Sequence, residues 1–208
     1  GRANRAAVYS SRLPADLTPN RTTDALTRLL EAGTAVLDLT ASNPTRVGIP
    51  YPADLLASLA DPRALAYEPE PLGLWSAREA VSADFDRRGV DVPPSRVALT
   101  ASTSEAYGLL FKLLCDPGDR VLVPRPSYPL FEHLTALESV VAVPYDLDPH
   151  DGWRLDPDAV GRAVDDRTRA VLVVSPNNPT GSCVHGPELD ALAAIAAGAG
   201  LAIIGDEV

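Results

Sequence analysis

The sequence has almost no lysine and almost no cysteine. Of its 18 basic residues only Lys112 is a lysine, a bias that we attribute to the base composition of the coding DNA. The two cysteines, Cys115 and Cys183, lie far apart and lack the CxxC spacing of many metal and redox sites. We therefore expect no metal site, and two free thiols in a reducing cytoplasm.

Long apolar runs, internal repeats and targeting signals are also missing. Without an apolar run long enough to cross a bilayer, the chain is not expected to span a membrane. The arginines of the first residues are not followed by the apolar segment of a signal peptide, so we expect a cytoplasmic protein. A net charge of −10 argues against a surface that follows nucleic-acid phosphates. No GxGxxG follows a predicted strand, which disfavours an NAD-binding Rossmann domain.

What remains is an ordinary globular composition. The 208 residues are 46% hydrophobic and 22% charged, enough for one large domain or slightly more. The first part of the chain predicts a helix at 22–32 and a short strand at 35–39, followed by a loop at 40–52 rich in Asn, Pro and Gly. We place a boundary in this loop, between a small segment at 1–47 and a main domain at 48–208.

Strands and helices alternate in the main domain, after a helix that begins near residue 75 and ends before Gly89. The apolar runs predict strands at 96–100, 120–124, 139–145, 169–174 and 201–205. Between them the spacing predicts helices at 104–114, 129–137, 157–164 and 187–198. Nearly continuous apolar strands are typical of parallel strands covered on both faces. The predicted fold is therefore α/β, with a doubly wound, mostly parallel sheet flanked by helices.

Polar segments follow four of these strands. In open parallel sheets, ligands bind beyond the carboxyl ends of the strands, so these segments are expected to meet at one edge. They are "ASTSEA" at 101–106, "RPSYP" at 125–129, "SPNNPTG" at 175–181 and "DEV" at 206–208.

Each segment has a ligand-binding and a purely structural interpretation. Ser102, Thr103 and Ser104 begin a helix, where free N–H groups and the positive end of the helix dipole favour a phosphate. Ser102 or Thr103 could instead only cap this helix, with Glu105 or Glu138 nearby for charge balance. The ring of Tyr128 could cover a flat ligand, or simply pack in a proline-rich turn.

The remaining two segments carry amides and a carboxylate. Pro179 restricts the backbone of Asn178 and thereby the direction of its amide, although "NNPTG" is also a common kind of turn sequence. Asp206 follows a strand that we expect to be central. A carboxylate there needs a cation or several donors, and a protonated ring nitrogen would serve, unless Asp206 caps a following helix.

Together these segments resemble the aminotransferase class I/II group of fold-type I pyridoxal-phosphate (PLP) enzymes. The resemblance runs from about residue 36 to the end of the chain and is most specific in the Asn-Pro-Thr-Gly motif. Its motifs are "SPNNPTG", the "DEV" after a strand, "TASTSEA" at 100–106, "DPGD" at 116–119 and "YEPEPLG" at 67–73.

The resemblance implies a role for each of these residues. Asn178 would bond the phenolic oxygen of PLP, Asp206 its pyridine nitrogen, and Tyr128 would stack on the ring. Ser102, Thr103 and Ser104 would bind the phosphate. Tyr67 would reach the phosphate of the neighbouring subunit's cofactor in a homodimer with shared active sites, and Asn43 would approach the substrate carboxylate. Residues 1–47 would belong to the family's small domain, and 48–208 to an incomplete PLP-binding large domain.

The lysine that such enzymes need is not apparent in the chain. Lys112 is predicted in the middle of a helix, away from the phosphate end, so we expect no catalytic residue within 1–208. The family resemblance puts the Schiff-base lysine, and an arginine for the substrate carboxylate, beyond Val208. The chain is therefore expected to be the N-terminal part of a longer protein.

The leading functional hypothesis is a PLP-dependent aminotransferase that moves an amino group between an amino acid and a 2-oxo acid. The cofactor-binding residues do not choose the bond that breaks, so elimination, replacement, cyclisation or decarboxylation stay open. A non-catalytic sensor or partner subunit with a PLP fold also stays open, because the lysine is missing. Neither a nucleic acid nor a membrane is expected as a partner.

Overall fold

The computed structural model describes residues 10–14, 16–40 and 43–207. The chain divides into two units, one over Asp16–Leu99 and the other over Thr100–Val208 together with the first residues up to Ala15. Among the helices of the described residues, none is long and apolar enough to cross a membrane.

The larger unit is built on a five-stranded sheet. Its strands are β1 (Arg120–Arg125), β2 (Val141–Asp148), β3 (Arg154–Leu155), β4 (Thr168–Val174) and β5 (Ala202–Asp206), in the order β3-β2-β1-β4-β5. All neighbouring pairs are parallel except β2 and β3, which form a short antiparallel pair. The prediction of a doubly wound, mostly parallel sheet is thus confirmed.

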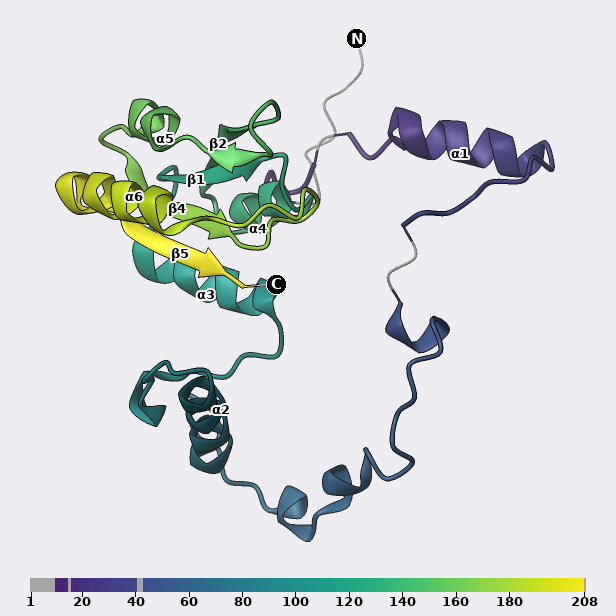
Figure 1. Ribbon diagram of the computed structural model, residues 1–208, viewed down its shortest axis with the longest axis vertical. Coiled ribbons are helices and arrows are strands. Elements are labelled where there is room, and N and C mark those ends of the chain that lie inside the picture. The colour runs from purple at the N-terminus through teal and green to yellow at the C-terminus, as the bar shows by residue number, and fades with distance from the viewer. Residues whose placement is uncertain (1–9, 15, 41–42, 208) are drawn as a thin grey trace. The chain divides into compact units, whose positions relative to one another are not determined.

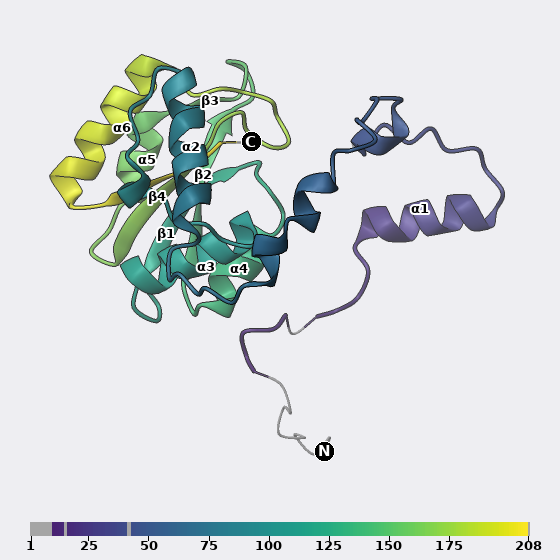
Figure 2. The same cartoon turned by 90° about the horizontal axis from the view of Figure 1, so that it is seen from below.

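Helices cover both faces of the sheet (Figures 1 and 2). On one face lie α3 (Thr103–Leu114) and α4 (Phe131–Leu137), and on the other α5 (Pro157–Ala163) and α6 (Gly186–Ala199). Successive side chains of a strand point to opposite faces, so the buried residues of β4 divide between two cores. Leu172 joins the core under α3 and α4, and Val171 the core under α5 and α6.

The apolar contacts of these cores supply most of the stabilisation. Phe111 and Phe131 are almost completely buried on the first face, and Val160 and Leu192 on the second. Each such side chain contributes about 1.5–3 kcal/mol relative to an exposed one. Because both faces are filled, the backbone at the carboxyl edge of the sheet rests on a packed support.

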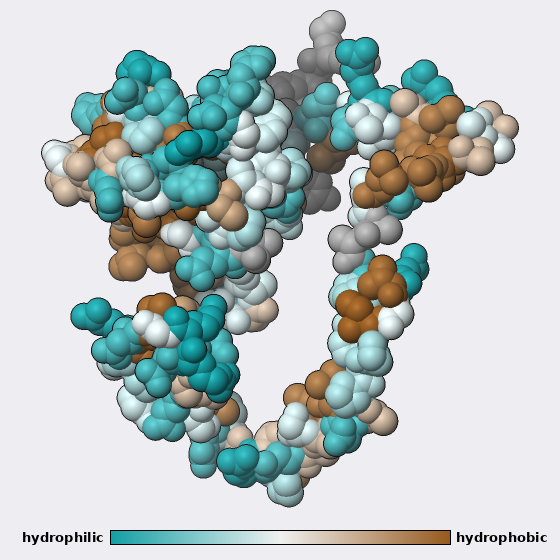
Figure 3. Space-filling view, in the orientation of Figure 1, coloured by the Kyte–Doolittle hydropathy of each residue, from teal (hydrophilic) through white to brown (hydrophobic). Residues whose placement is uncertain are grey.

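The smaller unit contains α1 (Arg21–Glu31), α2 (Trp75–Arg87) and four short 3-10 helices. Those are η1 (Pro44–Arg46), η2 (Ala57–Ala60), η3 (Pro62–Leu65) and η4 (Pro94–Arg96). The buried Arg78 of α2 donates hydrogen bonds to the carbonyls of Val97 (2.8 Å) and Pro94 (2.7 Å), which ties α2 to η4. Apolar side chains line an exposed side of α1 (Figure 3), namely Leu26, Leu29 and Leu30.

Two predicted strands are wrong. Residues 35–39 are irregular, and the segment 96–100 holds the end of η4 and irregular backbone. A strand needs a neighbour for its N–H and C=O groups, and apolar residues alone do not supply one. Val97 is buried, but its carbonyl accepts from Arg78, and Leu99 N–H donates to the carbonyl of Leu72 instead of to a sheet.

The other predicted helices and strands are present within a few residues of their expected ends. The short β3 was not predicted. Among the described residues β5 pairs with β4 alone, so its expected central place in the sheet stays a prediction. Cys115 and Cys183 are free, as expected. The domain boundary between residues 47 and 48 stays a prediction.

Candidate functional site

Three strands of the larger unit end at the same edge of the sheet. Val174 of β4 is in register with Asp206 of β5, and Leu122 of β1 with Val171 of β4. The loop after β4 is joined to β5 by a hydrogen bond from Ser175 N–H to the Asp206 carbonyl (2.9 Å). The segments after β1, β4 and β5 therefore begin at the same edge of the sheet, as the sequence predicts.

Asp206 is held by a tyrosine of the neighbouring helix. The Tyr107 hydroxyl of α3 donates to Asp206 Oδ2 at 2.5 Å. Burial, and the bond to the Asp206 carboxylate, raise the pKa of Tyr107 far above its usual value, so it stays a donor. A hollow of about 80 Å³ opens beside this pair, and Thr103 and Leu110 are among its walls. The start of α3 thus lies next to the carboxylate.

The start of α3 supports both interpretations of its serines. Ser102 Oγ accepts from Glu105 N–H (3.2 Å), and Glu105 returns a carboxylate oxygen to Ala101 N–H (2.6 Å), so Ser102 does cap the helix. Thr103 and Ser104 occupy the first turn, where backbone N–H groups have no partner within the helix. The positive end of α3 therefore remains available to an anion.

Tyr128 belongs to the same network of rings. Its side chain is 38% exposed and packs edge-to-face on Phe131, with ring centroids 5.8 Å apart. Phe131 packs in the same way on Tyr107 at 5.2 Å. Tyr128 also lines a hollow of about 440 Å³ beside the end of β1 and the first half of β2, together with Ser127 and Glu132. Tyr128 therefore packs on Phe131 and also lines a hollow, so both interpretations of this residue stay open.

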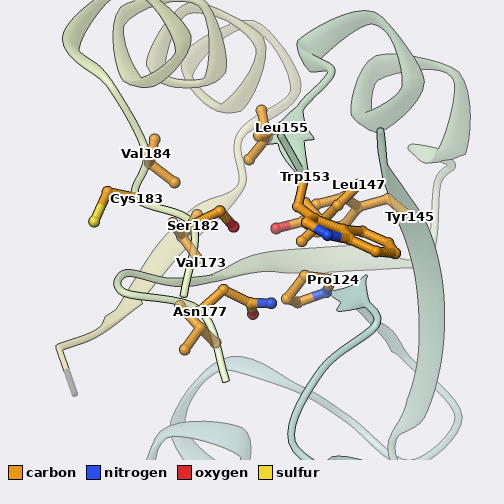
Figure 4. Close-up of a pocket in the computed structure, with 11 residues that line it drawn as sticks. Pro124, Tyr145, Leu147, Trp153, Leu155, Val173, Asn177, Ser182, Cys183 and Val184 are labelled. Atoms are coloured by element: carbon orange, nitrogen blue, oxygen red, sulfur yellow. The ribbon is translucent and has the colours of Figure 1, made fainter. Parts of the chain in front are cut away.

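The two asparagines of "SPNNPTG" have different environments. Asn177 is 4% exposed, and its Nδ2 donates to the Pro126 carbonyl (3.2 Å) and to Thr180 Oγ1 (2.9 Å), so it links the loops after β1 and β4. Figure 4 shows the Asn177 amide directed towards Pro124 of β1, beside a hollow of about 10 Å³ that is barely large enough for one water. Asn178 is exposed and makes no side-chain hydrogen bond within the described residues.

The predicted side chains do not line one common hollow. Asp206 borders the hollow beside α3, Tyr128 borders the one beside the end of β1, and Ser102 and Asn178 line neither of these two. Two buried oxygens at this edge, Ser127 Oγ and Asn177 Oδ1, have no hydrogen-bond partner in the described part of the chain. Buried polar atoms are seldom left unpaired, so these oxygens are compatible with a polar ligand or ordered water at this edge.

Lys112 lies away from this edge. Its ammonium pairs with Glu138 Oε1 at 2.5 Å, at the end of α4 that precedes the amino end of β2. This position agrees with the expectation that Lys112 is not the catalytic lysine.

Asn43 and Tyr67 belong to the smaller unit. Asn43 Oδ1 accepts from Thr45 N–H (3.0 Å) and from the Thr45 hydroxyl (2.6 Å), which caps η1. Tyr67 is 90% exposed and lines a hollow of about 640 Å³ with Asp61 and Trp75. Their proposed roles stay predictions.

Sequence reasoning missed two residues of the edge, Tyr107 and Asn177. Tyr107 sits in the apolar stretch "AYGLLF", where helical spacing marks it as a core residue and nothing indicates a bond to a residue far along the chain. For Asn177, the signal was its place next to Asn178 in the segment "SPNNPTG". An amide that follows a buried strand directly is itself placed to be buried and paired.

Comparison with known proteins places this geometry in a family. The model of the family "Aminotransferase class I and II" matches residues 36–208. The glutamate-pyruvate aminotransferase AlaA of Escherichia coli is 34% identical over 184 residues, which cover 87% of this chain and 45% of that protein. The aspartate/prephenate aminotransferase of Thermus thermophilus is 36% identical over 152 residues, covering 70% of this chain and 39% of that protein.

Solved structures give the same result. A single mutant of Thermus thermophilus aspartate aminotransferase matches with a TM-score of 0.81 at 30% identity, over 96% of this chain and 53% of that one. The Pyrococcus furiosus alanine aminotransferase matches with a TM-score of 0.76 at 30% identity, over 88% and 47%. The chain thus spans about half the length of the relatives it matches. Its fold is that of fold-type I aminotransferases, and the chain belongs to the aminotransferase class I and II family.

Proposed function

We propose that the full-length protein containing this chain is a PLP-dependent aminotransferase that transfers an amino group between an amino acid and a 2-oxo acid. The observation that carries the proposal is the Asp206 carboxylate at the end of β5, fixed by Tyr107 beside the first turn of α3. In a chain of this family, a carboxylate and a free helix N-terminus at one edge suit the two ends of PLP.

The residues at the edge fit the chemical groups of this cofactor. The N–H groups of Thr103 and Ser104, with the hydroxyl of Ser102, would hold the phosphate. Asp206 would accept a hydrogen bond from the ring N–H and so keep the pyridine nitrogen protonated. Asn178 would donate to the phenolic oxygen, and Tyr128 would cover one face of the ring and exclude water from it. When bound, PLP supplies an electron-poor ring that withdraws electrons from the substrate's α-carbon.

Other parts of the proposal rest on the family resemblance alone. They are a homodimer with Tyr67 reaching the neighbouring site, Asn43 near the substrate carboxylate, and a cytoplasmic location. The reaction also needs a lysine, which Lys112 does not supply because it pairs with Glu138.

An amino-group transfer assay tests the reaction type. The full-length product of the gene, supplied with PLP, is incubated with glutamate and pyruvate, the pair in the name of the AlaA relative. Further 2-oxo acids are tried in parallel, each with and without the amino donor. We expect a new amino acid only when donor and acceptor are both present. Consumption of the amino acid without an acceptor would indicate another PLP reaction, and no turnover with any pair would favour a non-catalytic protein.

A further inference from the structure

Tyr107 has no role in the proposed function beyond its contact with Asp206, yet its geometry is specific. It is 5% exposed, and its ring is fixed by Phe131 at 5.2 Å edge-to-face and by Phe111 at 5.9 Å stacked. From this fixed position the hydroxyl donates to Asp206 Oδ2 at 2.5 Å. The ring that carries the donor is thus packed between two aromatic rings, whereas the Asp206 side chain is only partly buried.

Resting on the proposed function, we propose that Tyr107 is a positioning residue that orients the Asp206 carboxylate towards the pyridine nitrogen of PLP. Tyr107 engages one carboxylate oxygen and leaves the other free for the ring N–H.

The position of Asp206 explains why it needs such a partner. It is the last residue of β5, and its side chain is only partly buried. Its backbone carbonyl accepts from Ser175 N–H at 2.9 Å, which fixes the main chain. Within the described residues, the side chain receives a hydrogen bond from Tyr107 alone. Without that bond, no hydrogen bond from the described residues would orient the carboxylate, and a site displaced by even a small distance loses much of its effect.

A second buried tyrosine separates this role from simple packing. Tyr145 of β2 is 3% exposed, and its hydroxyl donates to the backbone carbonyl of Leu172 at 2.8 Å. Both tyrosines thus have a buried ring and a hydroxyl that donates to a strand of the same sheet. Of the two, Tyr107 donates to an ionisable side chain at the carboxyl edge and Tyr145 to a backbone carbonyl, so Tyr145 provides a matched control.

The test compares Tyr107→Phe with Tyr145→Phe in the full-length protein. The dissociation constant of PLP is measured by titrating the cofactor-free protein, and the visible band of the bound cofactor is followed against pH. We expect Tyr107→Phe to weaken PLP binding by about tenfold to a hundredfold and to move the pH profile of the band. Tyr145→Phe should lower the melting temperature to a similar extent and leave both cofactor readouts as in the parent protein.

A second comparison keeps the result decisive if Tyr107→Phe also perturbs the fold. In an Asp206→Ala background, adding Tyr107→Phe should cause no further loss of PLP affinity, because the side chain that Tyr107 orients has been removed. An equally large further loss would overturn the inference, as would unchanged PLP binding in the single variant. In both cases the parent protein still binds PLP, so the proposed function stands. A parent protein that does not bind PLP would overturn both.

Discussion

Among single residues, Asp206 is the one on which the cofactor proposal most depends. Replacing it by asparagine keeps the size of the side chain and an acceptor for Tyr107, but removes the charge that holds the ring proton. We expect Asp206→Asn to bind PLP about tenfold to a hundredfold more weakly, with little change in melting temperature. PLP titration of the full-length protein measures this.

The control is Asp190→Asn, which removes a carboxylate from an exposed position of α6. It changes the net charge of the protein by the same amount and should bind PLP like the parent. Equal PLP affinity in the Asp206 and Asp190 variants would remove Asp206 from the site.

A second residue, Glu188, links stability to pH. Its carboxylate accepts from Arg154 Nε (2.7 Å) and from His185 N–H (2.7 Å) at the start of α6. Burial would raise the pKa of Glu188, but the hydrogen bonds from the His185 backbone and from Arg154 outweigh burial and lower this pKa. A lowered pKa in the folded state stabilises the protein above the usual glutamate pKa of about 4.3, and this contribution is lost as pH falls through the folded pKa.

We therefore expect Glu188→Gln to cost about 1.5–3 kcal/mol of the free energy of unfolding at neutral pH. Its deficit relative to the parent should shrink as the pH falls below about 4. Urea unfolding of both proteins across this pH range measures the difference in their unfolding free energies. The contributions of the other carboxylates are the same in both proteins and cancel in this difference. A deficit that stays constant with pH would show that the charge of Glu188 does not stabilise the fold.

At the scale of one element, the segment 175–181 separates structural support from ligand binding. Asn177→Ala removes two hydrogen bonds and leaves the Pro126 carbonyl without its donor, so we expect a loss of about 1–3 kcal/mol in unfolding free energy. Asn178→Ala removes an exposed amide and should change stability by about 0.5 kcal/mol or less. Chemical denaturation of the two variants compares them.

PLP titration tests the ligand-binding role proposed for Asn178. Asn178→Ala should weaken PLP binding while the fold keeps its stability, because Asn178 is proposed to contact only the cofactor. A stable Asn178→Ala protein with unchanged PLP affinity would contradict the role assigned to Asn178.

The elements also explain how far the sequence could predict this protein. The parallel strands from residue 120 onward could be predicted because both faces of the sheet are covered and most of their residues are apolar. The run at 96–100 has the same composition, but pairing depends on which neighbours lie beside it, and Arg78 takes the Val97 carbonyl instead. Composition predicts burial more reliably than it predicts hydrogen-bond partners.

The site was predicted in the same incomplete way. Asp206 and Tyr128 could be assigned to one edge because each follows the carboxyl end of a strand. Ser102 was assigned there through the strand at 96–100, which the structure lacks, although the start of α3 does lie beside Asp206. The bond from Tyr107 to Asp206 joins residues on different elements and depends on the tilt of α3 against β5. No local pattern in the sequence encodes such a contact, and it becomes visible only in the folded chain.

At the scale of the whole molecule, the parallel sheet is what makes a shared site possible. Strands β1, β4 and β5 run in the same direction, so the segments after them reach one edge although they are far apart in sequence. Two filled cores support this edge from both sides. Membership of the aminotransferase class I and II family is consistent with a cofactor bound there.

The most direct test of this account is whether the full-length product of the gene retains PLP. The purified protein is mixed with PLP, freed of unbound cofactor by gel filtration, and its visible absorption spectrum is recorded beside that of Asp206→Asn. The account predicts a visible band that remains with the parent protein and is much weaker for the variant. A parent protein that emerges with no visible absorption would contradict the central claim that this edge binds PLP.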